Sequence, residues 1–102
     1  MSLIENIKAH EGFRDHIYKD SLGKATIGYG FLVSALSADE LALNNGKTEP
    51  MGKEVADKIL NLKLKKLKKR LFQSLPWLQS KPQGVQDTLI EMAYQLGLAG
   101  LM

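Results

Sequence analysis

Residues 11–30, EGFRDHIYKDSLGKATIGYG, set one glutamate, one aspartate and one threonine around a short hairpin marked by glycine. A helix with apolar periodicity over residues 3–7 is expected to end at Glu11, where packed side chains would partly desolvate the carboxyl and raise its pKa. Asp20 lies beside the turn at 21–23, a wetter place where it is expected to stay ionised. Two carboxyl groups in unlike environments can divide the roles of acid and base, as cleavage of a glycosidic bond requires.

The glycines of this stretch indicate where a backbone or a ligand comes close. Gly23 suits a hairpin turn that needs positive φ, while Gly28 and Gly30 leave one face of a strand with little side-chain bulk. The alternative is that Glu11 and Asp20 are solvated surface charges, as most of the 11 acidic residues of this chain are expected to be. Spacing alone does not separate the two interpretations.

Two motifs carry a resemblance to a known family. Glu11, Asp20 and Thr26, continued as Thr-Ile-Gly-Tyr-Gly at 26–30, resemble the catalytic segment of the phage-type lysozymes, the endolysins of glycoside hydrolase family 24. Residues 91–97, EMAYQLG, are similar to the family's central helix at the floor of its cleft. The motifs stand in the right order and at about the right separation, so together they favour the family more strongly than either does alone.

The resemblance implies an enzyme that hydrolyses peptidoglycan between N-acetylmuramic acid and N-acetylglucosamine by an inverting mechanism. Glu11 would be the general acid that protonates the leaving oxygen, and Asp20 and Thr26 would hold and activate the attacking water. The alternative is a catalytically weak or inactive fragment that acts as a basic binding module for cell wall, a membrane surface or nucleic acid.

The resemblance also implies a set of substrate-binding residues. Leu32 and Tyr94 match positions that line the family's sugar cleft, and Gln95 offers an amide to an N-acetyl group. Gly30 belongs to the same set, since a strand that lacks bulk there admits a ligand. Without the motif around it, Tyr94 would instead be interpreted as an ordinary core aromatic with a satisfied hydroxyl.

The chain departs from the family at several positions. Phe31 stands where the family commonly has histidine, which predicts a change in lobe packing and no loss of chemistry. Lys24 and Ala25 occupy hairpin positions that are often aromatic, so sugar contacts from this strand are expected to be weaker. The sequence stops at Met102, where family members continue for several more helices, so the second lobe is expected to be incomplete.

Patterning predicts an α+β fold, and the resemblance implies that it is lysozyme-like and forms one domain, residues 1–102. Its expected parts are a catalytic sheet lobe over 1–50, a connecting helix over 51–75 and a partial helical lobe over 76–102. A small antiparallel sheet is expected within 16–33. The fold would thus join a sheet lobe to a helical lobe through one long helix.

Capping signals mark the remaining elements. Ser37 has the properties of a helix N-cap, with Glu40 three residues later as its partner in a capping box, and residues 44–46 end that helix. Residues 76–84 indicate a loop or short turn. The next helix, up to Leu96, is so apolar that a second copy or an altered packing is expected to cover it, which predicts self-association through residues 85–102.

Positive charge gathers in the second half of the chain. The net charge is +3, and residues 63–70, KLKKLKKR, hold most of the excess. Apolar residues recur through this region at three- and four-residue intervals, which predicts an amphipathic helix with one buried stripe. The predicted stripe consists of Ala56, Leu60, Leu64, Leu67, Leu71 and Leu75.

The lysine face of that helix has several interpretations. It could lie on nucleic acid, on an anionic membrane surface, or on the peptide carboxylates and anionic polymers of a bacterial wall, or it could be a solvated face that keeps the helix wet. No aromatic-rich basic strand or helix-turn-helix pattern accompanies it, so nucleic acid is not an expected partner.

Other features narrow the function class. The sequence has no cysteine, and His10 and His16 have no partners at metal-ligand spacing, so neither a metal nor a cofactor is expected. No secretory signal and no apolar run of bilayer length is visible, so stable membrane insertion is not expected. The resemblance implies a protein made in the host bacterial cytoplasm. It would reach its partner, the cell-wall peptidoglycan, through a membrane lesion made by a holin.

Overall fold

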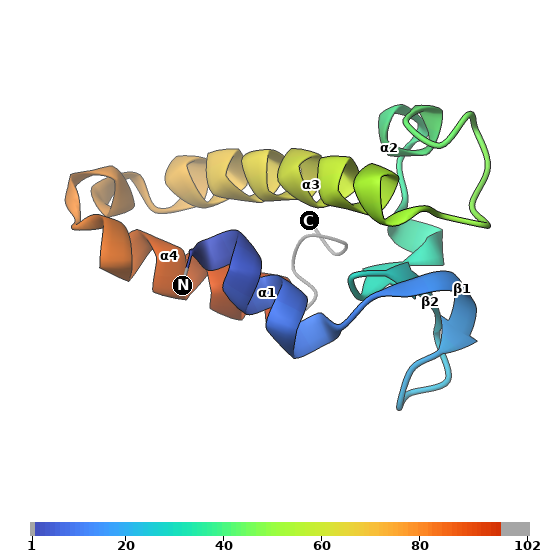
Figure 1. The fold of residues 1–102 in the computed structure, drawn as a ribbon. Coiled ribbons are helices and arrows are strands. Elements are labelled where there is room, and N and C mark those ends of the chain that lie inside the picture. The colour runs from blue at the N-terminus through green and yellow to red at the C-terminus, as the bar shows by residue number, and fades with distance from the viewer. Residues whose placement is uncertain (1, 97–102) are drawn as a thin grey trace. The chain divides into compact units, whose positions relative to one another are not determined.

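The computed structural model describes residues 2–96 and has an α+β architecture, as predicted (Figure 1). The elements are α1 (Leu3–Glu11), β1 (Arg14–Lys19), β2 (Ala25–Gly28), β3 (Phe31–Leu32), the 3-10 helix η1 (Val33–Ala35), α2 (Ala38–Ala42), α3 (Lys53–Ser74), the 3-10 helix η2 (Pro76–Ser80) and α4 (Gln83–Gln95). The chain divides into two compact units inside α3, between Asn61 and Leu62.

In the first unit, α1 begins and ends with well-defined caps. The Ser2 hydroxyl accepts a hydrogen bond from the Glu5 backbone N–H at 3.2 Å, which satisfies one free donor of the first turn. At the other end Gly12, with φ of 68°, donates its N–H to the Lys8 carbonyl at 2.9 Å. Only glycine adopts this φ without strain, so the helix stops directly after Glu11 and fixes that residue at its terminus.

The sheet consists of three antiparallel strands in the order β1-β2-β3 and spans residues 14–32, close to the predicted 16–33. The pairing of β1 with β2 has an irregularity between Arg14 and Tyr18, and regular pairing resumes where Tyr18 faces Thr26. Across the β2-β3 pair, Thr26 faces Leu32. The register therefore places Thr26 between Tyr18 and Leu32.

The predicted capping box at the start of α2 is confirmed. The backbone N–H of Ser37 donates to Oε1 of Glu40 at 3.0 Å, and Glu40 is buried in spite of its charge. The helix ends at Ala42, two residues before the predicted 44–46, and the chain then turns through Asn45 and Gly46, which both have positive φ.

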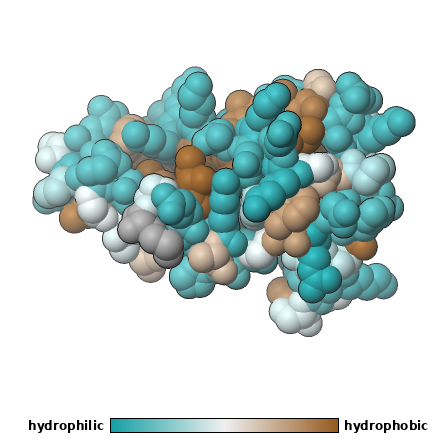
Figure 2. Space-filling view, viewed as in Figure 1, coloured by the Kyte–Doolittle hydropathy of each residue, from teal (hydrophilic) through white to brown (hydrophobic). Residues whose placement is uncertain are grey.

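The long helix predicted from the lysine-rich region is α3, and its apolar stripe is buried as expected. Five of the six predicted stripe residues are buried, while Leu75 lies just beyond the last turn and is half-buried. The lysines between them lie mostly on the exposed side, and hydrophilic side chains cover most of the face shown in Figure 2. None of the helices within residues 2–96 is long and apolar enough to cross a membrane.

In the second unit, the segment expected to be a loop or short turn forms the 3-10 helix η2, with Pro76 in its first turn. Its end is joined to α4 by the side chain of Gln86, which is 8% exposed. The Gln86 amide nitrogen donates to the carbonyls of Leu78 at 3.2 Å, Gln79 at 3.4 Å and Lys81 at 3.0 Å. Proline and glycine mark a turn here, and one buried amide satisfies three of its carbonyls.

Replacing Gln86 with leucine is expected to lower the free energy of unfolding by about 1–3 kcal/mol, because buried carbonyls lose their donor. Urea denaturation followed by circular dichroism measures this change. Gln83, an exposed residue of the same helix, supplies the control, and its replacement by leucine is expected to change the free energy by less than about 0.5 kcal/mol. Equal destabilisation by the two variants would contradict the role given to Gln86.

Candidate active site

The carboxyl group of Glu11 lies against the backbone of Gly30. A Cβ atom placed on Gly30 would stand 2.7 Å from Cδ of Glu11 and closer still to Oε2, so the absence of a side chain at this position makes room for the carboxyl. Burial raises the pKa of Glu11 from its ordinary value of 4.5, and nearby His10 offsets part of the rise. A carboxyl held partly away from water in this way keeps its proton to higher pH and can act as an acid.

The turn that carries Gly30 is shaped by its neighbours. Gly28 and Gly30 have φ of 67° and 73°, in the region that favours glycine. A Cβ on Gly28 would meet the ring of Phe31 at 2.6 Å, so this position also has no room for a side chain. Phe31 itself is 2% exposed and meets the Tyr29 ring edge-on, with 6.2 Å between the ring centroids. The residue that departs from the family pattern is therefore part of the core.

Asp20 closes the β1-β2 hairpin with one carboxylate oxygen. Its Oδ1 accepts hydrogen bonds from the backbone N–H groups of Leu22 and Lys24, both at 2.9 Å. Its own backbone N–H donates to the Lys24 carbonyl at 3.0 Å. Within residues 2–96, no donor bonds the second oxygen, Oδ2. The hairpin therefore fixes the carboxylate through Oδ1 and leaves Oδ2 able to bind a water or a sugar hydroxyl.

Thr26 is 3% exposed and lies two residues beyond the turn. Its hydroxyl donates to the Lys24 carbonyl at 2.9 Å, so the proton of the hydroxyl is directed toward the backbone. The lone pairs of Oγ1 then remain for a donor such as a water molecule. Asp20 and Thr26 are thus both anchored to Lys24, each with acceptor capacity left over.

Tyr18 belongs to the site although its role was not predicted. The pKa of its phenol is raised, mainly by burial and also by the negative charges of Glu11 and Asp20. The positive charge of Arg14 lowers this pKa and offsets part of the rise. The Arg14 guanidinium lies 5.0 Å from the centroid of the Tyr18 ring. The phenol therefore interacts electrostatically with both carboxylates. Hairpin register could have revealed it, since a turn between Asp20 and Lys24 brings residue 18 opposite Thr26.

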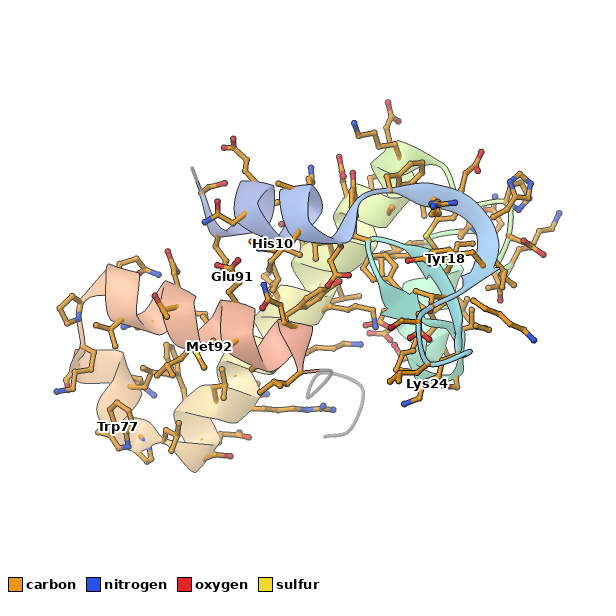
Figure 3. All side chains as sticks on the ribbon, turned by 90° about the horizontal axis from the view of Figure 1, so that it is seen from below. His10, Tyr18, Lys24, Trp77, Glu91 and Met92 are labelled. Carbon is orange, nitrogen blue, oxygen red and sulfur yellow. The ribbon has the colours of Figure 1, made fainter. Side chains whose placement is uncertain are left out.

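Figure 3 shows the elements that carry these groups, with Tyr18 and Lys24 on the hairpin and His10 on α1. Five of the predicted site residues lie in the first unit, namely Glu11, Asp20, Thr26, Gly30 and Leu32. Gly30, predicted as a substrate-binding residue, contacts the carboxyl of Glu11.

The other two predicted site residues, Tyr94 and Gln95, end α4 in the second unit. Tyr94 is 8% exposed and Gln95 is exposed. Contacts of Tyr94 and Gln95 with sugar stay a prediction. Among residues 2–96, no three histidine, cysteine or acidic side chains form a cluster that could hold a metal ion.

A network of three polar side chains joins α1, the turn before Gly30 and α3. Oδ1 of Asp57, on the first part of α3, accepts the Tyr29 hydroxyl proton at 2.8 Å and lies 3.0 Å from Nζ of Lys8 on α1. The Lys8 ammonium also lies 5.5 Å from the centre of the Tyr29 ring. Lys8 is one helical turn before Glu11, and Tyr29 is the residue before Gly30. No sequence pattern joins these three residues.

Comparison with curated proteins gives no match. Comparison with family models gives one, described as Phage lysozyme, over residues 8–102. This match takes in both motifs that carry the resemblance in the sequence. The chain therefore belongs to the phage lysozyme family, whose enzymes hydrolyse peptidoglycan.

Proposed function

We propose that the protein hydrolyses the β-1,4 bond between N-acetylmuramic acid and N-acetylglucosamine with inversion at the anomeric carbon. Glu11 is the general acid, and Asp20, assisted by Thr26, is the base that activates water. The observation that carries this proposal is the contrast between the two carboxyl groups. Glu11 is half-buried against Gly30 with a raised pKa, whereas Asp20 is fixed in a hairpin by two backbone N–H groups.

The first step of the reaction needs a proton on Glu11. Burial favours the neutral acid, so Glu11 carries a proton at a pH where an ordinary glutamate has lost it. That proton passes to the glycosidic oxygen as the bond to the leaving sugar breaks. The carboxylate that forms is then next to His10, whose charge in the protonated state would stabilise it.

The second step needs a water molecule on the opposite face of the sugar ring. Oδ2 of Asp20 accepts one proton of this water, and Oγ1 of Thr26 accepts a hydrogen bond from the other. Both side chains are immobilised through Lys24, which reduces the entropy lost when the water is placed for attack. The new bond to oxygen forms as Asp20 takes the proton.

Substrate binding in this proposal involves both units. Leu32, opposite Thr26 in the sheet, provides an apolar contact beside the catalytic water, and Gly30 leaves the Glu11 carboxyl open to the sugar. From the second unit, Tyr94 provides a ring face and Gln95 an amide for an N-acetyl group. Release through a holin lesion from the host cytoplasm is the delivery route that we propose.

The test of this function is the anomeric configuration of the first product. Fresh digests of purified peptidoglycan, followed by proton NMR, are expected to show the α-anomer of the new muramic acid reducing end before mutarotation mixes the two forms. Initial release of the β-anomer would reject the roles of Asp20 and Thr26, since a retaining enzyme would use the second carboxylate as a nucleophile. Salt-sensitive retention on DNA or membrane vesicles without release of reducing sugar would instead favour a basic binding module.

We also propose self-association through α4. Val85, Met92 and Leu96 are 42, 52 and 68% exposed, and their spacing places them along one face of the helix. A second copy would bury this apolar face. Sedimentation velocity tests the proposal, which predicts a dimer that Met92→Glu converts to a monomer. A monomeric parent protein would reject it. Residues 97–102 of the predicted interface lie outside the described part of the chain.

A further inference from the structure

The second unit has a cationic groove that the catalytic mechanism does not use. Its volume is about 370 Å³, and it is lined by Lys65, Lys68, Lys69, Phe72, Gln73 and Gln79. The first five lie on α3 at intervals of one, three and four residues, and Gln79 comes from η2. Gln79 is held in place because its carbonyl accepts a hydrogen bond from the buried Gln86 amide at 3.4 Å.

The lining of this groove fits a particular chemistry. The surface of the groove is mostly apolar, but three of the residues that line it are exposed lysines, whose ammonium groups attract anions, and no carboxylate is among the described lining residues. Phe72 is half-buried and offers an apolar surface, and the Lys68 ammonium lies 5.6 Å from the centre of its ring. Gln73 and Gln79 can donate to and accept from peptide groups. A ligand that matches all three features has carboxylates, amides and small apolar side chains.

We propose that this groove binds the short acidic peptides that are attached to the glycan strands of peptidoglycan. This inference rests on the proposed function, because that function makes such peptides part of the substrate. The phosphates of polyol phosphate polymers would pair with the ammonium groups, but these polymers have no apolar side chain to contact Phe72 and no peptide group to bind the two amides. The bound peptide would hold the enzyme on its polymeric substrate between cleavage events.

The test is a titration of the protein with the synthetic peptide N-acetyl-L-Ala-γ-D-Glu-L-Lys-D-Ala, which carries two carboxylates and one ammonium group, followed by ¹H–¹⁵N NMR. Saturable shifts are expected for residues of the groove, and amidation of both peptide carboxyls is expected to remove them. The double variant Lys68→Gln/Lys69→Gln is expected to weaken binding roughly tenfold, as for the loss of two exposed charge pairs. The matched control Lys58→Gln/Lys81→Gln removes two exposed lysines outside the groove lining and is expected to change affinity by less than about twofold.

Several results would overturn the proposal. They are the absence of saturable shifts, equal weakening by the two double variants, and binding of phosphatidylglycerol vesicles or single-stranded DNA in place of the peptide. The peptide contains no glycosidic bond, so its binding is independent of Glu11 and Asp20. An inactive protein that still binds the peptide would reject the proposed hydrolysis alone. An active protein that does not bind it would reject this proposal alone.

A different observation, in the first unit, points to a further residue of the hydrolytic reaction. Glu11 is held between the end of α1 and the Tyr29-Gly30 turn, and one oxygen of Asp57 binds a side chain from each of these, Lys8 and Tyr29. We infer that Asp57 is a positioning residue that keeps the Gly30 backbone closed on the Glu11 carboxyl. It acts through Tyr29 and Lys8 and has no contact with the reacting atoms.

The electrostatics of this network agree with the geometry. Burial alone would raise the pKa of Asp57, but the Tyr29 hydroxyl and the ammonium groups of Lys8 and Lys53 lower it overall, so its charged form is the one the fold stabilises. Burial and the same hydrogen bond raise the pKa of Tyr29 to about 12. The Tyr29 phenol therefore keeps its proton over the working range of the enzyme and acts as a donor.

Two substitutions separate positioning from simple destabilisation. Asp57→Asn keeps an oxygen for the Tyr29 proton but removes the charge that pairs with Lys8, and Tyr29→Phe keeps the ring but removes the hydrogen bond. Each is expected to lower kcat three- to tenfold with little change in KM. Each is also expected to move the alkaline limb of the kcat profile to lower pH, because a looser turn lets water reach Glu11. His10 and Tyr18, two titratable groups that interact electrostatically with Glu11, are retained in both variants.

The matched control is Asp87→Asn, which removes an aspartate that accepts a hydrogen bond from Gln83 in the second unit. It is expected to leave kcat and the pH profile unchanged. A lower melting temperature for Asp57→Asn with an unchanged pH profile would overturn the inference, since it would show a structural role only. An unchanged kcat in both Asp57→Asn and Tyr29→Phe would overturn it as well.

Discussion

Replacing Glu11 with glutamine is expected to lower the rate of peptidoglycan hydrolysis by roughly 10²- to 10⁴-fold, the contribution of a positioned general acid. The amide has nearly the shape of the acid and fits the same space beside Gly30, but it has no proton that it can transfer. Two measurements apply, the clearing of permeabilised Gram-negative cells and the release of reducing sugar from purified peptidoglycan.

The same substitution is expected to leave the melting temperature unchanged or higher at neutral pH. The pKa of Glu11 is raised in the folded protein, so the fold favours the neutral form. The stability that this neutral form contributes is complete below the ordinary pKa of 4.5 and is lost as the pH rises through the folded value. Glutamine does not ionise, so the advantage of Glu11→Gln over the parent protein should increase across that pH range.

Glu54→Gln is the control for this pair of results, because Glu54 is an exposed glutamate in the first turn of α3. It is expected to clear cells at the parental rate and to show no rise in melting temperature over the same pH range. Equal clearing by the parent protein and by Glu11→Gln would reject the catalytic role of Glu11. Loss of clearing together with a large fall in melting temperature would show instead that Glu11 is a structural residue.

The elements that could be predicted from the sequence are those that local rules determine. Three such signals involve residues within one or two helical turns of each other. They are the glycine after Glu11, the capping box of Ser37 and Glu40, and the apolar residues at helical spacing in α3. The hairpin around Asp20 follows the same logic, because the aspartate bonds the backbone of its own turn. These features place Glu11 and Asp20 correctly on their elements.

The parts of the site that could not be predicted depend on contacts between distant segments. Asp57 is 28 residues from Tyr29, and the hydrogen bond between them is decided by how the first part of α3 packs on the sheet. Tyr18 is placed opposite Thr26 by the register of β1 and β2, which pairs residues eight positions apart. Gly30 was predicted to bind substrate, and its contact with the Glu11 carboxyl is visible only in three dimensions.

Replacing Gly30 with alanine is expected to reduce hydrolysis by about 10²-fold or more and to lower the free energy of unfolding by about 1–3 kcal/mol. The φ of 73° disfavours any side chain, which accounts for the loss of stability. The new methyl group would also overlap the Glu11 carboxyl. Because that carboxyl is the end of a flexible side chain, it is expected to swing away and relieve the overlap, and the acid then no longer reaches the glycosidic oxygen.

Gly46→Ala separates these two effects. Gly46 has a similar φ of 77° but no atom within 4 Å of an added Cβ, so alanine there is expected to cost similar stability and no activity. In a Glu11→Ala background the overlap is absent, so Gly30→Ala should cost the same stability as Gly46→Ala and no further activity. Thermal unfolding and reducing-sugar release are measured for the parent protein, Gly30→Ala, Glu11→Ala, the double variant and Gly46→Ala. Full activity in Gly30→Ala would contradict the close packing of Gly30 on Glu11, because a displaced acid cannot protonate the leaving group at the parental rate.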